Sequence, residues 1–153
     1  MTITHATELR LTARPDADLR EDHFELARTE IGPLGEGEFL VRNDWMLLSV
    51  VMRDLMEAEP HPDLPMSAYE LGRPPWAPAV GTVVASRSAR YPTGDLVQHV
   101  YGFRDHILAT EDDPSFTTLD PTLLPSPEYH LNQGTTAWRG MVTLAATGPG
   151  DTV

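Results

Sequence analysis

The sequence predicts a mainly β domain with short helices, built as a barrel or a sandwich. Three observations predict this fold class. Short apolar runs, several of which alternate with polar residues, follow one another at a spacing of about ten residues. Turn-forming residues separate the runs, and the chain holds 11 glycines and 14 prolines. A length of 153 residues suits one domain, so we expect residues 1–153 to form a single domain.

The first expected elements are N-terminal strands within about residues 1–30. Residues 8–12 and 22–30 alternate between apolar and polar side chains, which indicates strands. Residues 38–46 are apolar nearly throughout, and their β-branched and aromatic content favours a buried strand. Residues 47–58 fit either a continuation of this strand or a short helix, because periodicity alone does not separate the two.

The sequence also predicts the elements in the middle and at the end of the chain. Residues 59–79 are rich in proline, which lacks the N–H that a strand needs, so we expect a long loop there. A loop of this length is more often functional than idle. Further strands are expected at residues 80–86, 96–101 and 103–109. An acidic loop at 111–127 and a helical segment at 129–146 complete the chain, although Gly134 and Gly140 weaken that helix.

Composition excludes several classes of function. Aspartate and glutamate number 23 against 11 basic residues, so the chain carries a formal charge of −12 and repels phosphate. We therefore expect neither nucleic acid nor an anionic membrane as a partner. The chain has no cysteine, and all of its basic residues are arginine, which excludes disulfides and lysine-based chemistry. It has no apolar run of about 18 residues and no signal-peptide pattern, so we expect a cytoplasmic protein.

A set of short motifs carries a family resemblance. The motifs occur at residues 35–43 (GEGEFLVRN), 52–53 (MR), 69–72 (YELG), 80–86 (VGTVVAS), 94–97 (GDLV), 136–138 (TAW) and 150–153 (GDTV). Their order and spacing resemble the N-terminal, GroES-like, substrate-binding half of zinc-independent medium-chain dehydrogenases and reductases. Within that group the chain is most similar to the NADPH-dependent alkenal, enone and prostaglandin reductases.

The resemblance implies a partly open, GroES-like β-barrel and favours a strand at residues 38–46. It also places residues 150–153 where the Rossmann half of the family begins, so we expect that half to be absent from this chain. No G-x-G-x-x-G turn, the usual dinucleotide-binding motif, occurs in the sequence. We therefore expect no cofactor, and NADPH only if a Rossmann half is supplied. The apolar surface left without that half predicts a homodimer.

Two departures from the family pattern affect its chemistry. The Asp-Pro-Tyr that precedes Met-Arg in the family is Ser49-Val50-Val51 here, so an isopropyl group replaces a hydroxyl that could donate to a substrate carbonyl. Where zinc-dependent relatives have a cysteine ligand and a His-Glu pair, this chain has Leu47 and Ala77-Pro78. We therefore expect no metal.

Four residues are candidates for catalysis. His99 and Tyr101 share one face of a predicted strand and could form an acid–base pair at the barrel mouth, or they could belong to a polar outer face. His130 precedes the turn where the family's substrate and nicotinamide would meet, although it could be an exposed loop residue. Asn132 could donate to a carbonyl or enolate oxygen, or it could cap a helix.

Seven further residues are candidates for substrate binding. Tyr69 and Trp76 bracket the proline-rich loop and could form an aromatic wall over an apolar ligand, or they could fill the barrel. Arg53 could bind a carboxylate, or it could pair with Asp54 or Glu57. The remaining candidates, all placed by the resemblance, are Val51, Met52, Gln133 and Trp138.

Three functions remain open. The first is a cofactor-free enzyme, an isomerase, cyclase or dehydratase that positions and polarises a hydrophobic carbonyl or enone compound of polyketide-like metabolism. The second is one half of an NADPH-dependent oxidoreductase whose nucleotide domain is missing or is supplied by another chain. The third is a non-catalytic binding or dimerisation module.

Overall fold

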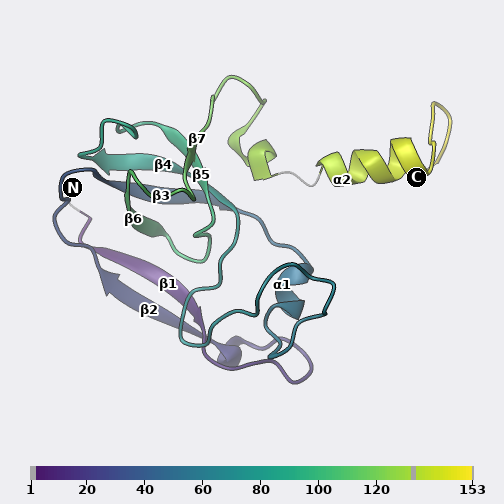
Figure 1. The fold of residues 1–153 in the computed structure, drawn as a ribbon, viewed down its shortest axis with the longest axis horizontal. Helices are drawn as coiled ribbons and strands as arrows, with labels where there is room; N and C mark the ends of the chain where they lie inside the picture. The colour runs from purple at the N-terminus through teal and green to yellow at the C-terminus, as the bar shows by residue number, and fades with distance from the viewer. Residues whose placement is uncertain (1–2, 132–133, 153) are drawn as a thin grey trace.

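Two antiparallel sheets form the body of the protein in a computed structural model that describes residues 3–131 and 134–152. In this part of the chain, β1 (His5–Leu11) and β2 (Phe24–Glu30) form a two-stranded sheet. The second sheet has the order β6-β3-β4-β5-β7. Its strands are β3 (Glu38–Met46), β4 (Ala79–Ser86), β5 (Leu96–His99), β6 (His106–Thr110) and β7 (Thr117–Thr118). The prediction of a mainly β, GroES-like, partly open barrel is confirmed (Figure 1).

The strand predictions hold at β1 to β4 and need correction near residue 100. The strand expected at 96–101 ends at His99, and the one expected at 103–109 begins only at His106. Between them the chain leaves the sheet and bonds elsewhere. The N–H of Leu9 donates to the carbonyl of Phe103 at 3.0 Å, and the N–H of Gly102 donates to the carbonyl of Ala77 at 3.1 Å. The loop expected at 111–127 also contains β7, which pairs with the edge of β5.

Helices are few and short, as expected. A 3-10 turn at Glu21–His23 precedes β2, so the strand expected from residue 22 begins at Phe24. Of residues 47–58, only Val51–Asp54 form a helix, α1, which buries Met52. No strand or helix occurs between residues 55 and 78, so the proline-rich segment is a loop up to the start of β4.

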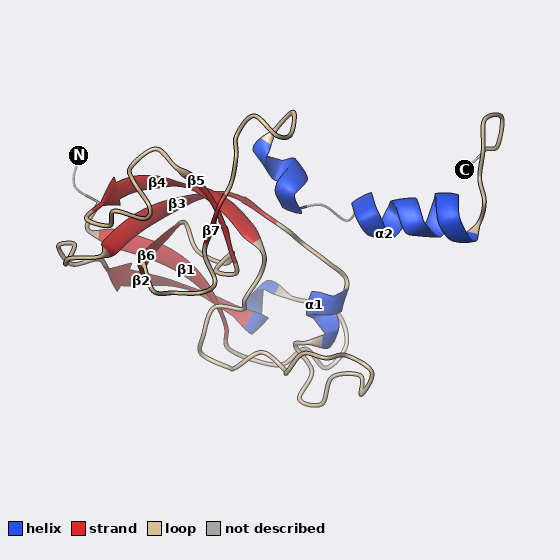
Figure 2. Cartoon of the chain, turned by 45° about the horizontal axis from the view of Figure 1, so that its top comes forward, coloured by secondary structure: helices blue, strands red, loops and turns tan. Residues whose placement is uncertain are grey.

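The C-terminal segment departs from the single helix expected at 129–146. It consists of a 3-10 helix, η2 (Pro127–Leu131), an α-helix, α2 (Gly134–Trp138), and a π-helix, η3 (Arg139–Leu144). Glycine is a poor helix former, which agrees with the irregular geometry around Gly134 and Gly140. Figures 1 and 2 show α2 and η3 extending away from the sheets, and neither buries a residue. None of the described helices is long and apolar enough to cross a membrane.

Two hydrophobic clusters fill the interior where the site is built. The first lies on the five-stranded sheet and contains Phe39, Val41, Val83, Tyr91, Val97, Ala109 and Phe116. Residues 39 and 41 of β3 point to one face because side chains alternate along a strand. The second cluster joins β1 and α1 to the proline-rich loop and contains Leu11, Met52, Leu55, Met56, Tyr69 and Ala77. This cluster packs against the loop of residues 67–76, which contributes Tyr69 and Trp76 to it.

Candidate functional site

An open cavity of about 760 Å³ lies between the β1–β2 sheet, the loop of residues 67–76 and the segment of residues 101–104. Its volume is in the range that small-molecule sites occupy. The lining residues are Glu8, Arg10, Thr29, Ser67, Ala68, Tyr69, Glu70, Gly72, Arg73, Pro74, Trp76, Tyr101 and Arg104. Aromatic rings and charged side chains therefore face the same space.

Backbone hydrogen bonds fix the loop side of the cavity. The N–H of Tyr69 donates to the carbonyl of Leu55 at 2.7 Å, which ties the loop to the end of α1. The N–H of Gly72 donates to the carbonyl of Leu11 at 2.7 Å, and the N–H of Leu11 donates to the carbonyl of Arg73 at 3.1 Å. Gly72 has φ +77°, a left-handed conformation that glycine adopts without strain. The loop is thus held as an added strand-like edge against β1.

Asn43 of β3 holds the opposite side. Its Nδ2 donates to the carbonyl of Tyr101 at 2.7 Å and to that of Arg104 at 2.8 Å. These carbonyls belong to the segment that leaves the sheet, and they would otherwise lack part of their hydrogen bonding. One amide side chain therefore sets the course of residues 101–104 and, with it, the positions of Tyr101 and Arg104.

The predicted pair of Tyr69 and Trp76 comes together at the cavity. Their rings meet edge to face, with centroids 5.7 Å apart and planes at 72°. Tyr69 is 3% exposed, and its hydroxyl donates to the carbonyl of Trp76 at 3.0 Å. Burial raises the pKa of Tyr69 to about 12, so the phenol stays protonated at neutral pH. Tyr69 anchors the loop from the core, while Trp76 offers its half-buried ring to the cavity.

Replacing Tyr69 with phenylalanine is expected to lower the free energy of unfolding by about 1 kcal/mol, because the carbonyl of Trp76 loses a buried hydrogen bond. Urea denaturation followed by circular dichroism measures the change. Tyr129→Phe is the matched control, since Tyr129 is 53% exposed and should lose its hydroxyl at no measurable cost. Equal stabilities for both variants would show that the loop does not depend on this contact.

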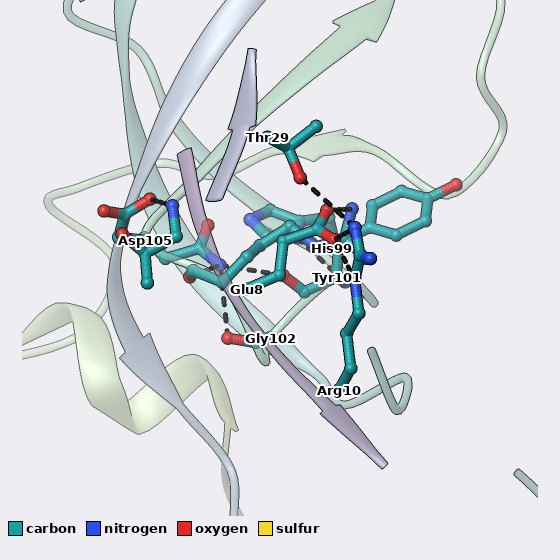
Figure 3. Close-up of polar contacts among 10 residues, drawn as sticks. Glu8, Arg10, Thr29, His99, Tyr101, Gly102 and Asp105 are labelled. Carbon is teal, nitrogen blue, oxygen red and sulfur yellow. Dashed lines mark hydrogen bonds and ion pairs between the residues drawn. The ribbon is translucent and has the colours of Figure 1, made fainter. Parts of the chain in front are cut away.

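His99, the last residue of β5, and Tyr101, which lies beyond the strand, are neighbours, but only Tyr101 lines the cavity. Their ring centroids lie 6.1 Å apart, and Figure 3 shows the two rings side by side. The hydroxyl of Tyr101 donates to Oδ2 of Asp113 at 2.8 Å, and burial raises the pKa of Tyr101. His99 is 1% exposed, its Nδ1 accepts the N–H of Tyr101 at 3.1 Å, and burial lowers its pKa to about 4. His99 is placed in the core as a neutral side chain, out of reach of a ligand in the cavity.

The charged lining was not identified from the sequence. Nε and Nη2 of Arg10 donate to Oε2 of Glu8 at 3.1 and 3.0 Å, and Nη2 also approaches Oγ1 of Thr29 at 3.4 Å (Figure 3). Nη1 of Arg104 lies 3.6 Å from Oε1 of Glu8. The spacing of residues 8 and 10 in a predicted strand could have indicated one shared face. No local pattern indicates that Arg104 lies across from them.

The candidates on α1 do not line the cavity. Met52 is buried in the second hydrophobic cluster. Arg53 pairs with Glu57, the structural alternative raised by the sequence, and its Nη2 donates to the carbonyl of Ala17 at 3.0 Å. Val51 is half-buried at the first turn of the helix. The substrate-binding role of these three residues stays a prediction.

His130 and Trp138, two of the candidates near the C-terminus, do not line the cavity. His130 is half-buried on η2, which packs against β3 and β4, and Trp138 on α2 is 61% exposed. Asn132 and Gln133 lie outside the described residues. Over residues 3–131 and 134–152, no three histidine, aspartate or glutamate side chains gather in a way that could hold a metal ion. Of the candidates from the sequence, Tyr69, Trp76 and Tyr101 line the cavity, and arginine and glutamate side chains complete its lining.

Comparison with known proteins agrees with the fold and gives it a family. Residues 7–117 match a family described as the N-terminal domain of oxidoreductase. The chain is 26% identical over 147 residues to the NADPH-dependent curcumin reductase of Escherichia coli (strain K12), a match that covers 94% of this chain and 41% of the relative. The chain thus spans about two-fifths of the length of that curated relative.

Solved structures show the same fold. CurA from Vibrio vulnificus superposes with a TM-score of 0.71 at 23% identity, covering 90% of this chain and 40% of CurA. CurA from the same organism in complex with NADPH gives a TM-score of 0.74 at 22% identity, covering 95% and 42%. The CurF ER cyclopropanase from the curacin A biosynthetic pathway gives a TM-score of 0.53 at 20% identity, covering 95% and 45%. These likenesses concern the fold.

Proposed function

Because the chain belongs to the family of oxidoreductase N-terminal domains, we propose that it forms the substrate-binding half of an NADPH-dependent reductase of conjugated carbonyl compounds. The observation that carries the proposal is the family match over residues 7–117, a range that contains every residue lining the cavity. The similarity to a curcumin reductase supports a planar, aromatic enone as the substrate.

The cavity supplies binding and orientation in this proposal. The half-buried ring of Trp76 and the ring of Tyr101 offer apolar surface to a flat conjugated ligand. Such positioning lowers the barrier to a reaction by holding the reactants in a productive geometry. The chain's own residues do not fit the cofactor, because the sequence contains no G-x-G-x-x-G turn to hold a pyrophosphate. NADPH would bind to a nucleotide domain that another part of the protein or another chain provides.

A second candidate is the cofactor-free isomerase or cyclase acting on a hydrophobic carbonyl or enone metabolite. One observation favours it: Val51 occupies the position where the family resemblance leads us to expect a tyrosine hydroxyl. A site that has lost this donor would suit a reaction that needs positioning rather than hydride transfer. The homodimer expected from the sequence also stays a prediction.

The two candidates predict opposite cofactor dependence. We would fuse this chain to the nucleotide-binding half of the E. coli curcumin reductase and follow NADPH absorbance with curcumin as the substrate. The fusion is expected to oxidise NADPH, and the unfused chain is expected to bind curcumin without consuming NADPH. Trp76→Ala in the fusion should lower kcat/KM by about tenfold, because the ligand loses an aromatic contact.

Two results would count against the reductase. If a folded fusion oxidises NADPH no faster with curcumin than without it, the proposal is contradicted. Chromatography shows whether the unfused chain converts curcumin without NADPH. Such a conversion would instead support the cofactor-free enzyme.

A further inference from the structure

The side chain of Arg104 lines the cavity and lacks a hydrogen-bond partner among the described residues. Only 15% of the side chain is exposed, and its Nε is a buried atom without a partner. Its closest carboxylate oxygen, Oε1 of Glu8, lies 3.6 Å from Nη1, which is too long for a hydrogen bond. The guanidinium also lies over the ring of Tyr101, with Cζ 5.4 Å from the ring centroid. The cavity wall thus holds a charged group with open donors.

A guanidinium in this state costs free energy. It carries five N–H donors in a rigid fork and stays charged in proteins. Burying a cation is unfavourable unless an anion and hydrogen bonds compensate for the lost water. Burial lowers the pKa of Arg104, Glu8 opposes that shift, and the charges of Arg10 and Arg73 add to it. The fold therefore leaves Arg104 short of negative charge.

The nearby glutamates supply only part of this charge. Oε2 of Glu8 accepts two hydrogen bonds from Arg10, and Oε1 of the same carboxylate makes only an ion pair of 3.6 Å with Nη1 of Arg104. Glu70 pairs with Arg73 at 3.3 Å, and both of those side chains are largely exposed. The lining therefore has three arginines against two glutamates, in a chain whose formal charge is −12. A local excess of positive charge in such an acidic protein indicates a site for an anion.

We propose that the cavity binds a carboxylate-bearing ligand and that Arg104 anchors the carboxylate through paired N–H···O hydrogen bonds. A carboxylate fits because its two oxygens match the two parallel donors of a guanidinium. The rest of the ligand extends along the rings of Trp76 and Tyr101. If the chain is the substrate-binding half proposed above, its substrate is a conjugated carbonyl compound that also carries an acid group. This inference rests on the proposed function only where it calls the ligand a substrate; the carboxylate site itself is argued from the cavity.

The test compares two probes that differ in one charge. The 153-residue chain is titrated with trans-cinnamate and with trans-cinnamamide, without NADPH, and binding is measured by calorimetry and NMR. Cinnamate is expected to bind about tenfold more tightly than cinnamamide, because only the carboxylate gains a charged hydrogen bond. Arg104→Gln should remove this preference. Arg28→Gln, which removes an exposed arginine of β2 outside the lining, should keep it.

A second variant moves affinity in the opposite direction. Glu8→Gln removes the carboxylate that competes for Arg104, so cinnamate should bind more tightly to it than to the unmodified chain, by about threefold or more. A purely structural role for these charges would weaken binding in both variants. Glu8→Gln also keeps the proposal testable if Arg104→Gln does not fold. Inorganic phosphate, added as a competitor, distinguishes a carboxylate site from a site for any anion.

Several outcomes would overturn the proposal. They are equal affinity for the two probes, a preference that survives Arg104→Gln, weaker cinnamate binding to Glu8→Gln, displacement of cinnamate by phosphate at equal concentration, and absence of binding by either probe at about 1 mM. Because the titration uses no NADPH, the carboxylate site can be confirmed even if the fusion shows no reductase activity. Conversely, reductase activity on neutral enones would not rescue a failed titration.

Discussion

Replacing Gly81 with alanine is expected to destabilise the protein by about 3 kcal/mol or more, because a methyl group has no space there. Gly81 lies on β4, the middle strand of the larger sheet, and pairs with Asn43 of β3 and Val97 of β5. A Cβ at this position would collide with the backbone oxygen of Arg42 and lie 2.6 Å from Cγ1 of Val41. A backbone oxygen inside a strand cannot move away without loss of the pairing that it belongs to.

The same substitution should reach the cavity through β3. Asn43, which faces Gly81 in the β3–β4 register, holds the carbonyls of Tyr101 and Arg104. A shift of β3 away from β4 would loosen those contacts and, with them, the wall that carries Arg104. We therefore expect Gly81→Ala to weaken cinnamate binding even at temperatures where the chain remains folded.

Urea denaturation measures the stability of Gly81→Ala. The matched control is Gly32→Ala, since a Cβ at Gly32 meets nothing within 4 Å and should change stability by no more than about 0.5 kcal/mol. If Gly81→Ala were as stable as Gly32→Ala, the close approach of β3 to β4 would be wrong, and the position of Asn43 over residues 101–104 would need revision.

Local patterns predicted the strands well because a strand exposes its alternation in the sequence. The run at residues 38–46 and the run at 80–86 correspond to β3 and β4 within one residue. His99 and Tyr101 do lie together, as expected, although β5 ends at His99 and Tyr101 is already outside the strand. Alternation could not tell which face of β5 is buried, because Phe116 buries that face. The ring of Phe116 lies 5.0 Å from that of His99, although the two residues are 17 positions apart in the sequence.

The charged part of the site could not be predicted, for a related reason. Glu8 and Arg104 are 96 positions apart, and they meet only because residues 101–105 leave the sheet and pair with β1. That departure depends on Asn43 and on backbone contacts with Ala77, neither of which forms a local motif. The loop residues Tyr69 and Trp76 were within reach of sequence reasoning because aromatic side chains in a long proline-rich loop need a surface to cover.

Lowering the pH from 6.5 to about 4 is expected to remove about 3 kcal/mol of stability through His99 alone. The cause is burial, which lowers the pKa of His99 in the folded protein to about 4 from 6.5. Above pH 6.5 the imidazole is neutral in both the folded and the unfolded chain, so its contribution is fully present. As the pH falls below 6.5, the unfolded chain binds a proton that the folded chain does not, and the equilibrium shifts toward unfolding until the pH reaches about 4.

The comparison that isolates this effect is between the unmodified chain and His99→Asn, in urea denaturation at a series of pH values from 7.5 to 4. The asparagine Oδ1 can replace Nδ1 as the acceptor of the Tyr101 N–H, but it does not titrate. Carboxylates with lowered pKa values, such as Asp105, also make the protein less stable in acid, but Asp105 does so equally in both proteins because His99 is not among the groups that lower its pKa. The difference in stability between the two proteins should therefore shrink by about 3 kcal/mol across this range.

His61→Asn serves as the control for the loss of a histidine, because the His61 side chain is 63% exposed and its replacement changes the surface and not the core. Parallel curves for the unmodified chain and His99→Asn would mean that His99 titrates near its ordinary pKa of 6.5 and is reached by water. In that case the acid–base pairing of His99 with Tyr101, which the sequence suggested, would again be a candidate for the chemistry. If the curves converge as expected, His99 supports the ring of Tyr101 from within the core, and the search for a reacting proton moves to groups that line the cavity.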